Sequence, residues 1–112
     1  MVNVMAMDVT TAFVRSREGG AIEVVVNFGP LSGREATLAE VDRLARRLLA
    51  VSSEVRVHAV RTHDMGPDRE TIIHQVVAEA KAAAEQADAV RDLCEAWAVE
   101  CAEERSLAPL PI

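Results

Sequence analysis

The side chains best able to do chemistry are gathered in one stretch of the chain. This stretch holds all three histidines and several carboxylates. The candidate ligand-binding residues are His58, His63, Asp64, Glu70 and His74. In a helix, Glu70 and His74 would share one face because they are four residues apart, and His63 would approach them if the preceding loop folds back. Two imidazoles and a carboxylate can hold a metal ion or act as an acid–base pair. The spacing matches no established metal motif, so a solvent-exposed loop followed by a helix cap is the simpler explanation.

A second candidate site is the polar face of the predicted sheet. Its polar side chains alternate along the predicted strands and comprise Asp8, Thr10, Glu23, Asn27, Arg56, His58 and Thr62. Antiparallel sheets commonly leave one face in water, which is sufficient to explain such a pattern. Apolar residues are mixed among the polar ones, so the face could instead line a ligand pocket or a subunit contact. They are Val4, Ala6, Ala12, Val14, Val25 and Val60.

Searches for other catalytic patterns give no candidate. Gly19-Gly20 belongs to neither a P-loop nor a dinucleotide-binding fingerprint. Cys94 and Cys101 are seven residues apart, so in one straight helix they can neither form a disulfide nor bind one zinc ion together. The sequence therefore predicts no catalytic residue, no metal site and no cofactor, and it favours a protein that is not an enzyme.

Composition and charge limit the partners that we expect. The 112 residues include 18 acidic and 12 basic side chains, giving a net charge of −6. This charge argues against nucleic acid or an anionic membrane as the main partner. Two cysteines make no disulfide framework, and we find neither a signal peptide nor a membrane-spanning run, so we expect a cytoplasmic protein. All the basic residues except Lys81 are arginine, which indicates the coding bias of a GC-rich, bacterial genome.

The elements that must position these residues begin with a β-hairpin. Residues 3–15 and 21–28 alternate as strands around Gly19-Gly20, and glycines accept the positive φ of a tight turn. A two-residue turn pairs Phe13 with Val26, Val14 with Val25 and Thr11 with Phe28. Residues 4–10 then extend beyond the second strand, so they need a third strand or another chain as a partner.

A helix, a third strand and a long final helix are predicted to follow. Thr37 and Glu40 match a capping box for a helix that ends near Ala50. Residues 54–62 alternate as a strand. We therefore expect an α+β fold in the order ββαβα, with a three-stranded mixed sheet packed with one amphipathic helix and one very long C-terminal helix. These elements form a single domain over residues 1–106, followed by a flexible tail at 107–112.

The final helix, over about residues 69–105, is predicted from a heptad pattern that runs from residue 73 to residue 101. Apolar or small residues recur with a mean spacing of about 3.5, the coiled-coil value. The series is Ile73, Val76, Ala80, Ala83, Ala87, Val90, Cys94, Trp97 and Cys101. A helix of this length is longer than the domain before it, so we expect these nine residues to form an oligomer interface. The alternative is one long amphipathic helix folded onto its own sheet.

The sequence thus favours a non-enzymatic, homo-oligomeric interaction or scaffolding protein. The expected partner is a second copy, as a homodimer or higher oligomer, assembled through the final helix and by strand addition. Another protein is the second candidate partner. The alternative function is a small enzyme or a ligand- or metal-binding protein that uses the His63, Glu70 and His74 corner or the polar sheet face around His58.

Overall fold

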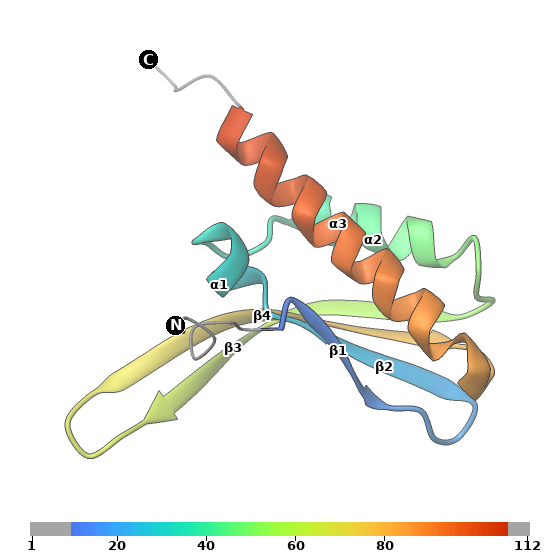
Figure 1. The fold of residues 1–112 in the computed structure, drawn as a ribbon, viewed down its shortest axis with the longest axis horizontal. Helices are drawn as coiled ribbons and strands as arrows, with labels where there is room; N and C mark the ends of the chain where they lie inside the picture. Colours follow the sequence, from blue (N-terminus) through green and yellow to red (C-terminus); the bar gives the residue numbers. More distant parts are fainter. Residues whose placement is uncertain (1–9, 108–112) are drawn as a thin grey trace, which may run out of the picture.

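The α+β class predicted from the sequence is confirmed by the fold. A computed structural model describes residues 10–107 (Figure 1). Its elements follow one another as β1 (Ala12–Ser16), β2 (Ala21–Val26), α1 (Phe28–Ser32), α2 (Leu38–Leu48), β3 (Val55–Met65), β4 (Glu70–Lys81), the 3-10 turn η2 (Ala84–Gln86) and α3 (Ala87–Leu107). Most of the predicted tail, and the first part of the predicted first strand, lie outside the described residues.

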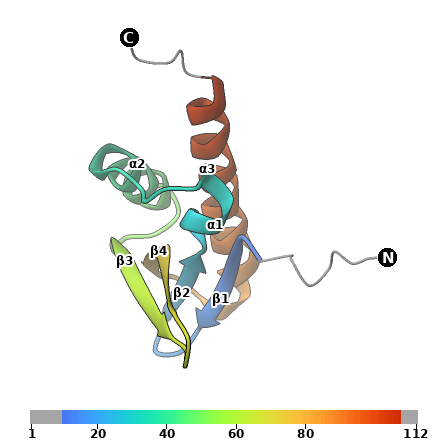
Figure 2. The ribbon, with the colours of Figure 1, turned by 90° about the vertical axis from the view of Figure 1, so that its left-hand side faces the viewer.

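The sheet has four strands in the order β1-β2-β4-β3, and every neighbouring pair is antiparallel. The predicted three-stranded mixed sheet was therefore wrong in its strand count and in its mixed character. The helices all lie on one face of this sheet (Figure 2), and the core fills the space between them. Its largest side chains are Trp97 and Phe28, whose ring centroids are 5.3 Å apart. No helix in residues 10–107 is long and apolar enough to cross a membrane.

The predicted long helix was wrong in its first half. Residues 70–81 form strand β4, and α3 begins only at Ala87, after the turn η2. Gly66 donates its backbone N–H to the carbonyl of Arg69 over 2.8 Å. This bond closes the turn between β3 and β4, where the sequence suggested a strand end and a helix start.

The position of β4 in the sheet explains the error. β4 is a central strand with β2 on one side and β3 on the other, and Val76, Val77 and Ala78 are buried in succession. A strand that is buried on both faces has a continuous apolar run instead of alternation. Periodicity alone does not distinguish such a run from a buried helix.

A β-bulge explains a second difference, in the register of the first hairpin. Gly19 and Gly20 both have positive φ, at 69° and 75°, and Ser16 pairs with Glu23 as a two-residue turn requires. Between Val14 and Ser16 the ladder shifts by one residue, so that Phe13 pairs with Val25 and Ala12 with Val26. Phe13 therefore lies on the face away from the helices, and Ala12 lies in the core.

The start of α2 was predicted correctly. The Thr37 hydroxyl accepts the backbone N–H of Glu40 over 3.2 Å, and the Glu40 carboxylate accepts the backbone N–H of Thr37 over 2.9 Å. These two bonds satisfy donors that the first turn of a helix leaves free. The short α1 was not predicted; Gly33, with φ 79°, ends it.

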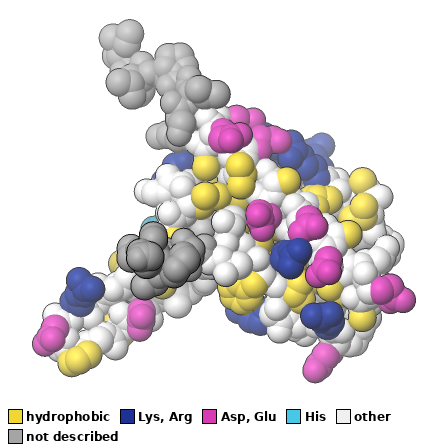
Figure 3. All heavy atoms as spheres, viewed as in Figure 1, with side chains coloured by type: hydrophobic (Ala, Val, Ile, Leu, Met, Phe, Trp, Pro, Cys, Tyr) yellow, Lys and Arg dark blue, Asp and Glu magenta, His cyan; other side chains and the backbone are white. Residues whose placement is uncertain are grey.

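Beyond the helices, β3 and β4 continue alone as a two-stranded ribbon. We call residues 61–74 the arm. Its pairing runs from Arg61↔His74 to Met65↔Glu70 without a shift in register, and every residue from 61 to 72 is exposed. The arm stands clear of the rounded body of the molecule, with apolar side chains and charges of both signs on its surface (Figure 3).

Candidate functional site

The arm brings two of the predicted site residues together. His63 pairs with Ile72, and Glu70 lies two positions before Ile72 on β4, so both side chains are on the same face of the ribbon. The His63 Nδ1 atom contacts the Glu70 carboxylate. Both side chains are well exposed, so water can reach this pair from most directions. The contact arises from the register of a hairpin and not from a helix face.

His74, Asp64 and His58 lie apart from this pair. In a strand, four residues separate Glu70 from His74 by about 13 Å. His74 lies beneath α1, where a Cβ added to Gly29 would be 3.1 Å from the Cβ of His74. Asp64 pairs with Thr71 on the other face of the arm. In the part of the chain that the structure describes, no group of three or more His, Cys, Asp or Glu side chains is placed to hold a metal ion.

Among residues 10–107, the face of the sheet opposite the helices has an apolar row at its centre. Phe13, Val25, Val77 and His58 lie side by side across β1, β2, β4 and β3. Val25 and Val77 are buried although they face away from the helices, whereas Phe13 is exposed. We call this side of the sheet the uncovered face. The sequence placed Ala12 and Val14 on it, but both contribute to the core on the helix side.

An ionic row lies next to the apolar one. The Arg15 guanidinium donates two hydrogen bonds of 2.9 Å to the Glu23 carboxylate, and Arg56 lies 3.6 Å from Glu79. The hydrogen bond from Arg15 is the largest reason why the pKa of Glu23 lies below its ordinary value. Both acids of the row therefore have a cationic partner, Arg15 for Glu23 and Arg56 for Glu79.

A row of hydrogen-bonded amides completes the uncovered face. Thr62 donates its hydroxyl to Gln75 over 2.8 Å, and Gln75 donates its amide to Asn27 over 2.8 Å. Asn27 in turn donates to the backbone carbonyl of Thr10 over 2.7 Å. The predicted polar residues Asn27 and Thr62 thus hold strands together, and Asp8 lies outside the described residues.

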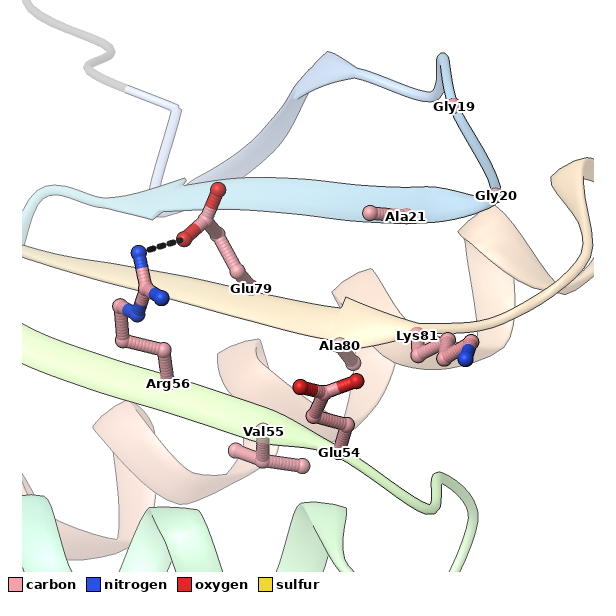
Figure 4. Close-up of a pocket in the computed structure, with 9 residues that line it drawn as sticks. All are labelled: Gly19, Gly20, Ala21, Glu54, Val55, Arg56, Glu79, Ala80 and Lys81. Carbon is pink, nitrogen blue, oxygen red and sulfur yellow. Dashed lines mark ion pairs between the residues drawn. The ribbon is translucent and has the colours of Figure 1, made fainter.

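An open pocket of about 340 Å³ lies beside the Gly19-Gly20 turn, where β2 and β3 begin and β4 ends. Its lining consists of Gly19, Gly20, Ala21, Glu54, Val55, Arg56, Glu79, Ala80 and Lys81. Arg56 and Glu79 reach toward one another across the two strands (Figure 4). Small-molecule sites are usually enclosed and mostly apolar. This pocket is open and carries two acids and two bases, so it makes a poor ligand site.

The nine residues predicted to form a helical seam do not lie on one helix. Five lie on α3 and are buried in the chain's own core, three lie on β4, and Ala83 is exposed in the connection between them. The α3 residues are Ala87, Val90, Cys94, Trp97 and Cys101; those on β4 are Ile73, Val76 and Ala80. Burial raises the pKa of the Cys94 thiol to about 12 and is the main reason why that of Cys101 rises to about 11. Neither thiol is therefore activated as a nucleophile.

The sequence interpretation missed the arm and the position of β3 at the edge of the sheet. Gly66-Pro67 between two runs of alternating residues is a hairpin signal that could have revealed them. Comparisons with protein-family models, with curated proteins and with solved structures found no match for this chain.

Proposed function

We propose that this chain is a non-enzymatic protein that assembles with copies of itself and serves as an interaction or scaffolding module. The observation that carries the proposal is the arm. A two-stranded ribbon is at best marginally stable alone in water, yet this one extends from the body with all of residues 61–72 exposed. A neighbouring chain that packs against such a ribbon would stabilise it.

Exposed apolar side chains on the arm support the same proposal. Met65 is 71% exposed and Ile72 is 47% exposed. Both lie on the side of the ribbon that faces the helices in the body, as the alternation along β3 and β4 requires. Covering them with another chain would remove apolar surface from water, which favours association.

The proposed contact differs from the heptad seam. The α3 residues of that seam are buried in the core of their own chain, so a second helix could reach them only by displacing part of that core. Another chain could contact the exposed surface of the sheet and the arm without displacing part of this chain. Ligand binding at His63 and Glu70 is less favoured, because the pair is exposed and lacks a third ligating side chain among the described residues.

The test is a sedimentation-equilibrium measurement over a range from micromolar to near-millimolar protein. We expect the mass to rise with concentration to twice the 12.1 kDa of one chain or beyond. A mass that stays at 12.1 kDa over the whole range would contradict the proposal. The protein should be measured with bound metal removed, so that a metal-mediated dimer is not mistaken for the proposed one.

A further inference from the structure

We propose that the partner is a second copy of this chain, and that it adds to the outer edge of β3. The two β3 strands would pair antiparallel over their whole length, with Val60 on the twofold axis. This inference rests on the proposed self-association and specifies its surface, its symmetry and its register.

The two edges of the sheet differ in how open they are to pairing. β1, at one edge, has five residues and is interrupted by the bulge between Val14 and Ser16. β3, at the other edge, has eleven residues that pair with β4 without interruption. Bulges and short length protect edge strands, whereas a long, regular edge is a template for another strand. In residues 10–107 no strand pairs with the outer side of β3.

The charges along β3 favour one register of self-pairing. Val60 is the midpoint of the strand, so a twofold axis through it pairs all eleven residues with residues of the second copy. Arg56 then lies directly opposite Asp64 of the second copy, and the symmetry produces this contact twice. Opposite charges at facing positions stabilise an antiparallel pair, and the Arg56 side chain is 78% exposed and able to reach across.

Neighbouring registers are less favourable. An axis through Arg61 would place the two Arg61 side chains opposite each other, and like charges in that position are destabilising. An axis through Ala59 would leave Asp64 and Met65 without partners and would put Arg56 opposite Thr62. Only the register centred on Val60 uses the whole strand and opposes no like charges.

The helix side of this dimer joins apolar surfaces that are exposed in the single chain. Antiparallel pairing brings Met65 of one copy opposite Val55 of the other. Val55 begins β3 directly after the connection from α2, where Leu49 is 54% exposed and Val51 is 50% exposed. α2 lies on the β3 side of the sheet (Figure 2). Each arm would therefore lie beside the partner's α2, with Met65 near these two residues.

The decisive experiment is disulfide formation on the twofold axis. In this register Val60→Cys places two thiols on directly facing residues, close enough to bond. Thr62→Cys is the matched control, because its two copies would lie four residues apart along the strands, about 13 Å. Under mild oxidation we expect Val60→Cys to form a covalent dimer on a non-reducing gel and Thr62→Cys to stay single. The double variant His58→Cys with Thr62→Cys should cross-link again.

Charge exchange tests the register independently. Arg56→Asp and Asp64→Arg should each raise the dimer dissociation constant about tenfold, and the two together should restore most of the affinity. Glu79→Gln is the control, because it removes the partner of Arg56 within the chain but leaves the contact between copies. It should dimerise like the unchanged protein.

The outcomes separate this inference from the proposed function. A dimer in which Thr62→Cys cross-links and Val60→Cys does not would overturn the register and leave self-association standing. If the protein dimerises but no β3 cysteine variant cross-links and no charge variant changes the dissociation constant, the β3 edge is not the contact surface. A chain that is monomeric at every concentration would overturn both proposals.

Discussion

At the scale of single residues, Glu40 connects more of the fold than any motif in the sequence suggests. Its carboxylate accepts hydrogen bonds of 2.8 and 2.7 Å from Arg34 and one from the Thr37 backbone. Its backbone carbonyl accepts the indole N–H of Trp97 over 2.9 Å. Arg34 also lies over the Phe28 ring, 5.2 Å from its centroid. One residue of α2 therefore ties together α1, its own helix and α3.

This arrangement predicts a stability that depends on acid. The hydrogen bonds from Arg34, more than any other contact, hold the pKa of Glu40 at about 2. Because the folded-state pKa is lowered, the stabilisation is complete above the unfolded pKa of about 4.3. It is lost as the pH falls from there toward 2. Glu40→Gln should remove this dependence, so its urea midpoint should lie below that of the unchanged protein at pH 6 and approach it at pH 2.5.

An exposed glutamate provides the control for this measurement. Glu103 lies on α3 and is exposed, so Glu103→Gln should follow the unchanged protein across the same pH range. If Glu40→Gln also follows it, the carboxylate does not contribute as its contacts indicate.

At the scale of elements, two alanines of the heptad series distinguish the core from a seam between chains. Ala87 begins α3 and is 1% exposed within the core cluster, whereas Ala83 is exposed. Ala87→Glu would bury a charge without a partner and should lower the free energy of unfolding by several kcal/mol, on the order of 3 or more. Ala83→Glu should leave the thermal midpoint and the mass unchanged. Circular-dichroism melts and sedimentation measure both.

A helical seam between chains would give the opposite pattern. Both substitutions would then dissociate the oligomer, and both variants would stay folded. A folded, monomeric Ala87→Glu variant would therefore restore the seam as the association surface.

Elements whose ends carry characteristic residues, such as capping side chains or turn glycines, were predictable from the sequence. Elements defined only by packing were not. The Thr37–Glu40 capping box and the Gly19-Gly20 turn follow from side-chain and backbone preferences that act locally. β4 was misread because neighbours on both sides remove its alternation, and the bulge after Val14 leaves no residue signature. The approach of His63 to Glu70 was anticipated, but its cause was not, because cross-strand neighbours appear only once β4 is known to be a strand.

At the scale of the whole molecule, pairing through β3 would join two four-stranded sheets into one of eight strands. A twofold axis perpendicular to the sheet keeps both helix layers on one side and both uncovered faces on the other. The arms would then cease to be isolated ribbons, because each would be paired on its outer side with the body of the other copy. The arm, which extends as an isolated ribbon from the body of the single chain, would thus lie near the centre of the dimer.

Hydrogen exchange should reveal this change. In dilute protein the amides of residues 61–72 should exchange much faster than those of β2, because the exposed arm opens locally at little cost. In concentrated protein, protection should rise along β3 and the arm, since antiparallel pairing occupies the outward N–H groups of the edge strand. The protection of the β1 amides should not rise, because the bulged β1 edge makes no contact with the second copy in the proposed dimer. The Arg56→Asp variant, compared at the same high concentration, should show a smaller rise along β3. A rise confined to α3 or β1 would instead place the contact at the heptad helix or at the opposite edge.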